Sequence, residues 1–510
     1  MNQALALEIM LAGESALLTG PAGAGKTYVL NRFIQFAKAE GKKVSVTATT
    51  GLAATHLGGN TIHSWSGIGI ADILPSGFAD RLPKTRREII EKTDVLIIDE
   101  ISMLHDFRLD MVDEVCRLVR KKDEPFGGIQ LIMSGDFFQL PPVNRADSQT
   151  GGFVVHSQAW AELEPAILYL EEQYRQNDEH LLEILNALRA NDVRRHHAEK
   201  LLERADIAAP HDDITELHTV NIDVDTLNKK RLQQLDAEEK VYTQVTTGSQ
   251  NYVENLQRSV LVPPELKLKK GALVMAVKNS PTRTYANGSV GTVIGFEQGT
   301  EYPIVEFRNG KTVTMTPESW ELRDGDKKRA SISQIPVRLA WAITVHKSQG
   351  MTLDAAKIDL RKAFVPGMGY VALSRVKNLE NLYLYGINRM ALQISEDALA
   401  INDVLKDRAS VDKKRFSHLE VAAQKRTEGG DKLLAKTKKS AAGKSWADKI
   451  AKMRETHPNA YKAWTKQDDA TLKQGFLNGE DAAKLANTLG RHEGSIIKRL
   501  EKHFGEDIQS

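Results

Sequence analysis

The sequence predicts an α/β protein with two parallel-sheet domains, a small β insertion in the second domain and a helical domain at the end of the chain. Three observations support this fold class. Apolar strands alternate with helical segments over about the first 140 residues, the alternation resumes after residue 216, and three short amphipathic helices follow residue 446. Such alternation favours doubly wound sheets, whose ligands bind at the carboxyl ends of the strands.

The first α/β domain is expected over residues 1–190. Its predicted strands and helices alternate: a helix at 4–12, strands at 16–18, 44–49, 95–100 and 130–134, a helix from Lys26 to Gly41, and a helix through Leu109 to Val119. Residues 66–93 are rich in proline and glycine, and we interpret them as a small irregular insertion.

The second α/β domain is expected over 191–281 and 331–405. Between these two parts, residues 282–330 combine short β-branched runs with an Asn-Gly turn, which favours a small antiparallel barrel. Residues 406–445 are interpreted as a basic linker, because twelve Lys/Arg stand against five Asp/Glu from Lys406 to Lys444.

Residues 446–510 are interpreted as a tri-helical domain of helix-turn-helix type, with a capping box at Thr465–Asp468. Its last helix has a basic face, formed by Arg491, His492, Lys498, Arg499 and Lys502. Such a face suits duplex phosphates, but helices of this size also carry charges for solvation alone. Contact with duplex DNA and contact with protein therefore both stay open.

The composition is that of an ordinary globular protein. Of 510 residues, 41% are hydrophobic and 27% charged, and the net charge of +2 gives no information on polyanionic partners. No stretch approaches the roughly 18 uninterrupted apolar residues of a membrane span. The start Met1-Asn2-Gln3 does not resemble a secretion signal, so we expect no membrane partner and a cytoplasmic or nucleoid location. The single cysteine, Cys116, excludes an intramolecular disulfide and is expected in the core.

Residues Gly20–Thr27 form the pattern G-x-x-x-x-G-K-T between a predicted strand and a predicted helix. Glycines at these positions let successive N–H groups wrap a polyphosphate at the start of the helix. Lys26 would pair with the β- and γ-phosphates, and Thr27 would bind Mg²⁺. The alternative is a glycine-rich turn without a ligand.

Two adjacent acids end the predicted strand at 95–100. Asp99 would bind Mg²⁺ opposite Thr27, and Glu100 would orient and deprotonate the attacking water. Neighbouring strand residues point to opposite faces, so one acid could instead be merely solvated. Gln139, after the next strand, is in position to sense the γ-phosphate or its water, although a loop amide there could also be inert.

Phosphoryl transfer also needs cations for the charge on the γ-phosphate, and arginines supplied by the same chain meet that need. Arg175 and Arg375 are the candidates. Either one alone is more often a surface ion pair.

Together these motifs resemble a superfamily-one helicase, most closely the PIF (petite integration frequency) family. The matching segments occur in family order: Gly20–Thr27, Thr50–Ala54, Thr61–Trp65, Asp99–Met103, Gly135–Pro142, Tyr174–Arg175, Thr344–Gly350 and Val371–Arg375. The resemblance covers about 1–390. It implies two RecA-like P-loop domains with nucleotide between them, a wedge insertion near 66–93 in the first, a barrel insertion in the second, and 5′-to-3′ movement on single-stranded DNA.

The resemblance also implies roles for single residues. Lys26, Glu100, Gln139, Arg175 and Arg375 would be catalytic, and Thr27 and Asp99 would bind the metal. The nucleotide would contact Gln3, which reads the adenine, together with Gly20, Gly23, Ala24, Gly25, Lys26, Thr27 and Tyr28. DNA would contact Thr50, His63, Trp65, Phe138, Thr344, His346, Lys347 and Gln349, residue types that suit phosphates and base faces. His63 and Trp65 could instead be packed side chains.

We therefore expect an ATP- and Mg²⁺-dependent DNA helicase, acting as a monomer on single-stranded DNA and on single-strand/duplex junctions. Replication, recombination and repair are the processes that such an activity serves. Two alternatives stay open: an ATPase that strips proteins from DNA without separating strands, and a nucleotide-switched DNA-binding module with negligible turnover.

Overall fold

The computed structural model describes residues 1–69, 72–144, 149–173, 178–205, 207, 214–280, 284–285, 287–324, 327–426, 456–459 and 464–504. The chain divides into two compact units, Met1–Gly430 and Asp431–Ser510, each of which is described by itself. No helix in the described ranges is long and apolar enough to cross a membrane.

The first unit contains a six-stranded parallel sheet in the order β3-β2-β4-β5-β1-β6. Its strands are β1 (Ala16–Thr19), β2 (Val44–Ala48), β3 (Asn60–Thr61), β4 (Val95–Asp99), β5 (Gln130–Gly135) and β6 (Ala166–Tyr169). The apolar sequences of β1, β4, β5 and β6 follow from burial on both faces. The strands predicted from the sequence in this domain are confirmed.

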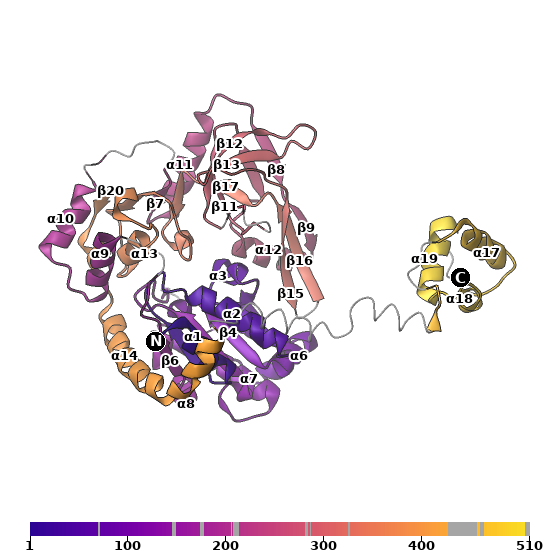
Figure 1. Ribbon diagram of the computed structural model, residues 1–510, viewed down its shortest axis with the longest axis horizontal. Coiled ribbons are helices and arrows are strands. Elements are labelled where there is room, and N and C mark those ends of the chain that lie inside the picture. The colour runs from indigo at the N-terminus through magenta and orange to yellow at the C-terminus, as the bar shows by residue number, and fades with distance from the viewer. Residues whose placement is uncertain are drawn as a thin grey trace. The chain divides into compact units, whose positions relative to one another are not determined.

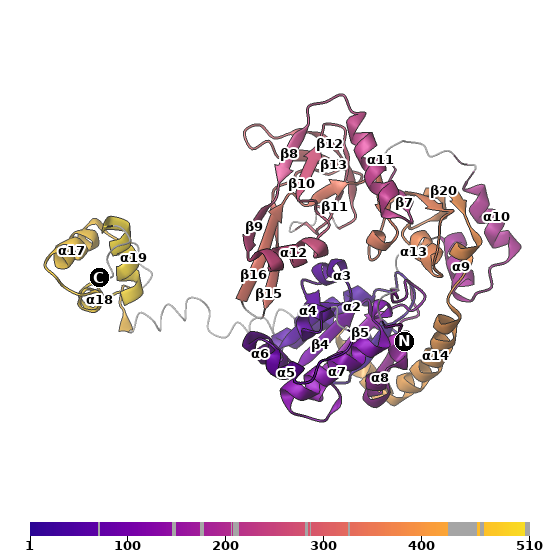
Figure 2. The same cartoon turned by 180° about the vertical axis from the view of Figure 1, so that it is seen from behind.

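Helices cover both faces of this sheet. The connection from β1 to β2 and that from β4 to β5 run in opposite directions, so right-handed crossovers place their helices on opposite faces (Figures 1 and 2). The helices of this domain are α1 (Gln3–Leu11), α2 (Lys26–Ala39), α3 (Gly51–His56), α4 (Ile62–Ser66), α5 (Phe78–Arg81), α6 (Lys84–Lys92), α7 (Asp106–Arg120) and α8 (Gln158–Leu163). Cys116 is buried on α7, as expected.

The insertion expected at 66–93 is more regular than its composition suggests. Residues 78–81 and 84–92 are the helices α5 and α6, and Pro83 directly precedes α6, where its missing N–H costs nothing. Arg120 of α7 donates hydrogen bonds to the carbonyls of Ile90, Glu91 and Thr93 and so completes the end of α6. Residues 70 and 71 lie outside the described ranges.

A second parallel sheet has the order β18-β7-β19-β20. Its strands are β7 (Glu216–His218), β18 (Ala342–Thr344), β19 (Ala356–Leu360) and β20 (Leu382–Ile387). The helices around it are α9 (Glu179–Arg189), α10 (Arg195–Glu203), α11 (Asn221–Gln233) and α13 (Met368–Leu373). This is the expected second α/β domain.

The β insertion is larger than the expected 282–330. Antiparallel strands already begin at Lys240 and continue to Leu339: β8 (Lys240–Thr243), β9 (Val245–Gly248), β10 (Glu265–Leu268), β11 (Leu273–Ala276), β12 (Val290–Phe296), β13 (Pro303–Phe307), β14 (Thr312–Thr314), β15 (Glu318–Asp324), β16 (Lys327–Gln334) and β17 (Val337–Leu339), with helix α12 (Gln250–Ser259). The early boundary was missed because β11 is a continuous buried apolar run, a pattern typical of a parallel strand.

The first part of the expected linker, residues 406–426, belongs to the folded first unit. Helix α14 (Glu396–Arg415) continues past the expected boundary at 406 and packs against β6. Its side chain Asp412 accepts the backbone N–H of Ile167 at 2.8 Å, and Arg426 pairs with Glu8 of α1. The remainder of the expected linker, 427–445, lies outside the described ranges.

The second unit contains the three predicted helices: α17 (Lys466–Leu477), α18 (Ala482–Leu489) and α19 (Glu493–Phe504). The capping box at Thr465 and Asp468 is confirmed. The expected basic face is partly wrong, because Arg491 is 3% exposed and donates to Asp468, while Arg499 donates to Asp469. Both guanidiniums lie over the ring of Trp464, at 4.3 and 5.2 Å from its centroid, so they hold this fold together.

Candidate functional site

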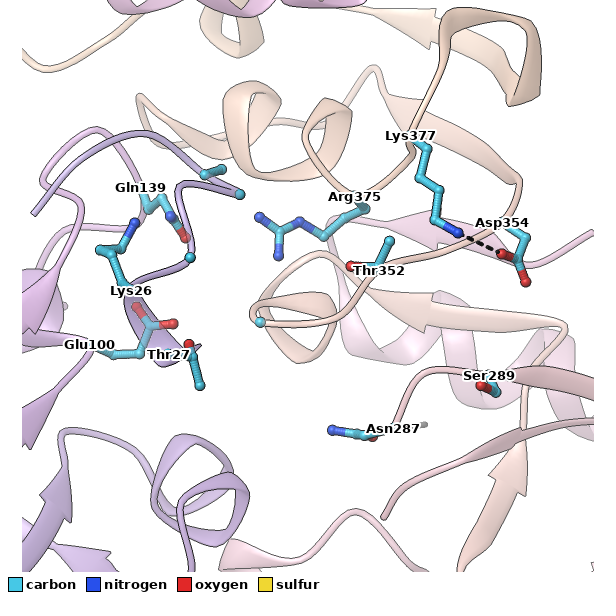
Figure 3. Close-up of a pocket in the computed structure, with 14 residues that line it drawn as sticks. Lys26, Thr27, Glu100, Gln139, Asn287, Ser289, Thr352, Asp354, Arg375 and Lys377 are labelled. Carbon is cyan, nitrogen blue, oxygen red and sulfur yellow. Dashed lines mark ion pairs between the residues drawn. The ribbon is translucent and has the colours of Figure 1, made fainter. Parts of the chain in front are cut away.

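A cavity of about 570 Å³ lies between the phosphate loop and the second α/β domain (Figure 3). Its walls come from both parallel sheets and from the β insertion: Ala22, Gly23, Gly25, Lys26, Thr27, Glu100, Gln139, Asn287, Ser289, Gly350, Thr352, Asp354, Arg375 and Lys377. Seven of these residues are predicted from the sequence to bind nucleotide or to catalyse its hydrolysis, and they come from both halves of the chain: Gly23, Gly25, Lys26, Thr27, Glu100, Gln139 and Arg375.

The phosphate loop has the backbone that its glycines predict. Gly23 and Gly25 adopt left-handed φ values of 87° and 84°, and a side chain at Gly20 would come within 2.4 Å of the carbonyl oxygen of Leu170. The ammonium of Lys26 donates to the carbonyl oxygens of Gly20 and Pro21 at 2.8 and 3.1 Å. The loop ends at the N-terminus of α2, where backbone N–H groups favour an anion.

Glu100 lies at the end of β4 in a left-handed backbone conformation, with φ of 54°. Burial and the neighbouring carboxylate of Asp99 raise the pKa of Glu100 to about 7, although Lys26 and Arg375 oppose this shift. Burial also raises the pKa of Asp99. A carboxyl with a pKa near neutrality matches the requirement for a general base at physiological pH.

Gln349 of the second α/β domain contacts Glu100 of the first. It was expected to contact DNA, but it is 8% exposed, and its side-chain amide donates to Oε2 of Glu100 at 2.9 Å. The second domain therefore touches the predicted catalytic base of the first domain directly.

Gln139 is held by a buried network that sequence analysis missed. Asp136 accepts hydrogen bonds from the amide of Gln139 at 3.4 Å, from Arg189 at 2.8 Å and from the hydroxyl of Tyr370 at 3.2 Å. Burial would raise the pKa of Asp136, but the cations Arg189 and Lys26 hold that pKa below its usual value. Nothing in the local sequence of α9 distinguishes Arg189 from a solvated arginine.

Arg375 extends from the second domain toward the phosphate loop (Figure 3). It is 1% exposed, and its guanidinium donates to the carbonyls of Val371, Ser348 and Met351. The other predicted arginine, Arg175, lies outside the described residues.

Four of the predicted DNA-contact residues lie together in a smaller cavity of about 260 Å³. Thr50 of the first domain faces His346, Lys347 and Gln349 of the second there, next to Asp99 and Glu100. Burial lowers the pKa of His346 and of Lys347.

Three other residues that are predicted to contact DNA are buried in this structure. Trp65 is 6% exposed in the main hydrophobic core, and Thr344 is 2% exposed. Phe138 is 2% exposed beneath the guanidinium of Arg189, 4.2 Å from its ring centroid. His63 is half-buried, and burial together with Arg108 lowers its pKa to about 4, so its ring is neutral.

Gln3 and Tyr28, both predicted to contact the nucleotide, line a third cavity of about 300 Å³ beside the phosphate loop. The amide of Gln3 donates to the carbonyl of Ala24 at 3.0 Å, and the ring of Tyr28 is 59% exposed. Arg32 and Arg426 also line this cavity. An amide next to an exposed aromatic ring suits a planar base.

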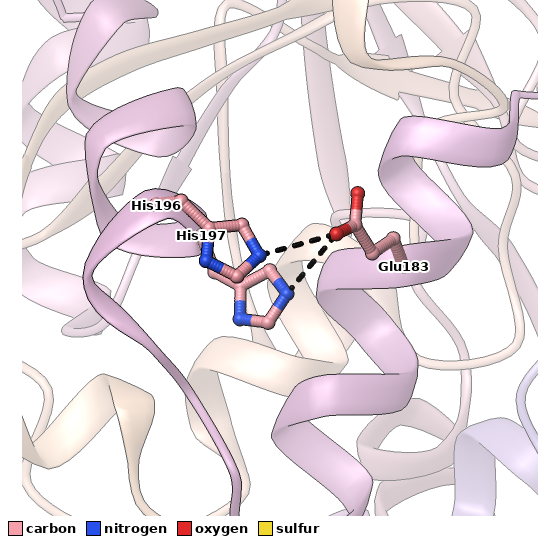
Figure 4. A group of neighbouring side chains, drawn as sticks. All are labelled: Glu183, His196 and His197. Atoms are coloured by element: carbon pink, nitrogen blue, oxygen red, sulfur yellow. Dashed lines mark hydrogen bonds and ion pairs between the residues drawn. The ribbon is translucent and has the colours of Figure 1, made fainter.

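A cluster outside these cavities has a composition that suits a metal, namely Glu183, His196 and His197 (Figure 4). However, Nδ1 of His197 accepts the backbone N–H of Arg194, so the ring proton is on Nε2, the atom that faces Glu183. Lys200 also pairs with Glu183 at 2.8 Å. These contacts identify an ion-pair cluster that joins α9 to α10.

Comparison with known proteins places this geometry in a family. Residues 2–190 match the model of the PIF1-like helicases. The ATP-dependent DNA helicase Pif1 of a Psychrobacter species is 39% identical over 480 residues, which cover 82% of this chain and 73% of that protein. The chain belongs to the PIF1-like helicase family.

Solved PIF1-like helicases share the fold. The Bacteroides Pif1 in complex with ADP-AlF4 is 30% identical, with a TM-score of 0.70 over 80% of this chain and 97% of that one. Another Bacteroides Pif1 structure, bound to single-stranded DNA, is 32% identical, with a TM-score of 0.57 over 79% and 96% of the two chains. The expected α/β architecture with two RecA-like domains is thereby confirmed.

Proposed function

We propose that this PIF1-like helicase couples ATP hydrolysis to movement along single-stranded DNA in the 5′-to-3′ direction, and thereby separates duplex strands. The observation that carries this proposal is a single cavity lined by the phosphate loop and Glu100 of one RecA-like domain and by Arg375 of the other. A ligand in this cavity contacts both domains, so its hydrolysis changes how they are held together. The complex of the Bacteroides Pif1 with ADP-AlF4 supports the placement of nucleotide in this cavity.

Magnesium fits the residues present. Asp99 and Glu100 are two adjacent carboxyls whose ionised forms are disfavoured by burial, and Thr27 lines the same cavity. A divalent cation relieves that penalty. Thr27 and Asp99 would hold it, and it would neutralise charge on the phosphate oxygens.

The chain's own residues supply the remaining chemistry. Lys26, released from the carbonyls of Gly20 and Pro21, pairs with the phosphates. Glu100, with its raised pKa, takes the proton of the attacking water, and Arg375 stabilises charge on the γ-phosphate from the opposite wall. Gln349 connects this chemistry to the cavity that contains Thr50, His346 and Lys347, where we place the DNA.

The decisive experiment compares ATPase activity with and without single-stranded DNA and then unwinding of matched 5′-tailed and 3′-tailed duplexes. We expect strong stimulation by DNA and unwinding of the 5′-tailed substrate only. Unstimulated turnover would contradict the motor, and preference for the 3′ tail would contradict the polarity.

The second candidate function is an ATPase that strips proteins from DNA without separating strands. Substitutions on α5 and α6 distinguish this ATPase from a helicase. Exposed substitutions on these helices should reduce unwinding and leave the DNA-stimulated ATPase intact if they form the wedge. Unwinding at the wild-type rate would contradict the wedge assignment.

A further inference from the structure

A cavity of about 570 Å³ lies between the second RecA-like domain and the β insertion, and it is separate from the nucleotide cavity and from the cavity lined by Gln3 and Tyr28. Its walls come from α11, from the segment that precedes β10, from β10 itself, from β17 and from Lys347. Two cations, Arg338 of β17 and Lys347, face this space together.

Asp225 lines the same cavity, but neither cation forms an ion pair with a carboxylate in the part of the chain that the structure describes. The Nε of Arg338 is buried without a hydrogen-bond partner, and its guanidinium forms no ion pair with any described residue. Burial lowers the pKa of Arg338, and burial together with the charge of Arg338 lowers the pKa of Lys347. The carboxylate that opposes both shifts is Asp225.

The rest of the wall does not neutralise this pair. The cavity is lined by four cationic side chains, Lys229, Lys267, Arg338 and Lys347, and by two carboxylates, Asp225 and Glu265. Glu265 is engaged by Lys267 at 3.2 Å. Two neighbouring cations that are partly withdrawn from water and not paired destabilise a fold, and an anion in the cavity removes that penalty.

The position of the cavity indicates which anion it takes. Lys347 lines both this cavity and the smaller one that contains Thr50, His346 and Gln349. A chain of phosphates that passes Thr50 and His346 therefore reaches Lys347 and then Arg338. A single free anion would occupy one cavity only, so the connection through Lys347 favours a polymer of phosphates.

We infer that Arg338 and Lys347 form a phosphate-binding site for the backbone of single-stranded DNA, with Arg338 as a contact outside the motif segments. This inference rests on the proposed function. Arg338 was not predicted from the sequence because it lies between apolar residues of a short strand. Its fork of N–H donors suits a phosphate oxygen pair better than a lysine does.

The test compares the wild-type chain with Arg338→Met in binding to a single-stranded oligo(dT) over a range of salt concentrations. Loss of one charge-assisted contact should weaken binding roughly tenfold, and the slope of log affinity against log salt should become shallower by about 0.7. Arg338→Lys should restore most of the slope. Lys230→Met, which removes an exposed lysine of α11 away from the cavity, should leave both values near wild type.

Thermal unfolding without DNA separates this role from a structural one. Because Arg338→Met removes a partly buried cation that forms no ion pair with any described residue, we expect a Tm no lower than that of the wild type. A lowered Tm with unchanged oligo(dT) affinity would show a packing residue and overturn the inference.

Inorganic phosphate at constant ionic strength distinguishes the source of the anion. If phosphate raises the Tm of the wild type but not of Arg338→Met, while oligo(dT) binding is the same in both, the site takes a free anion and the assignment to DNA is wrong. Failure of the proposed function is a separate result, namely wild-type ATPase that DNA does not stimulate.

Discussion

Replacing Gln349 by Met tests the contact that joins the two RecA-like domains at the catalytic base. The amide of Gln349 donates to Oε2 of Glu100 at 2.9 Å and thereby lowers the pKa of Glu100, which burial and Asp99 hold at about 7. Without the amide this pKa rises further, so less of the base is ionised at neutral pH. A hydrogen bond to a charged group contributes about 1.5–3 kcal/mol, and a tenfold change in rate corresponds to about 1.4 kcal/mol. We therefore expect ATP turnover to fall by about ten- to a hundredfold near neutral pH.

The assay is steady-state ATPase activity at saturating single-stranded DNA, measured from acidic to alkaline pH. The acidic limb of the profile should shift to higher pH in Gln349→Met, and the deficit should shrink as the pH rises. Lys347→Met is the matched control, since it should weaken DNA binding without moving the limb. If Gln349→Met instead weakens DNA binding and keeps the wild-type pH profile, Gln349 is a DNA contact and the bond to Glu100 has no catalytic role.

Further predictions concern Glu100, Arg189 and Trp65. Glu100→Gln should keep ATP binding and lose turnover by about 10²–10⁴-fold, and full turnover would remove Glu100 from the mechanism. Without nucleotide and metal, the Tm of the wild type should fall as the pH rises from about 4.5 to about 7, because Glu100 keeps its proton in the folded state over that window and loses it in the unfolded state. Glu100→Gln should not show this fall in Tm. Arg189→Met leaves Asp136 buried without its cation and should cost about 3–5 kcal/mol in denaturant unfolding, and an unchanged midpoint would contradict the network. Trp65→Ala should lower stability by about 3–5 kcal/mol without changing DNA affinity, whereas the reverse result would restore the predicted DNA contact.

The parts of the site that could be predicted are those in which a short stretch of sequence determines the backbone conformation. Lys26 and Glu100 follow buried strands, and the loops after such strands open at the same edge of the sheet. The phosphate loop needs glycines at left-handed positions, and these are visible in the sequence.

The parts that could not be predicted depend on neighbours that are distant in the chain. Phe138 follows a strand as an exposed contact would, but Arg189 of α9 covers its ring. Trp65 is enclosed in the same way by the core of its domain. Burial of this kind leaves no trace in the local sequence, because an aromatic residue on a loop serves equally well as a stacking surface or as a core residue.

The misassigned linker has a related cause. Leu405, Ala409 and Asp412 form a buried stripe along α14, and Phe416, which directly follows the helix, is buried as well. The carboxylate of Asp412 and the lysines around it obscure the apolar helical period of this segment in the sequence. The burial of Asp412 is explained by the backbone N–H of Ile167, which donates a hydrogen bond to it. High charge therefore indicates disorder only where no such stripe is present.

The buried network also suggests how nucleotide in the cavity acts on the second domain. The backbone N–H of Ala22, in the phosphate loop, donates to the hydroxyl of Tyr370 at 2.9 Å, and this hydroxyl donates to Asp136 and accepts from Arg189. Tyr370 belongs to α13, which leads directly to Arg375. A phosphate that shifts the loop must break or move the bond from Ala22, and because Tyr370 is 1% exposed in a packed core it cannot yield by rotation alone. We therefore expect a displacement of the loop to be transmitted through Tyr370 to α13 and so to Arg375.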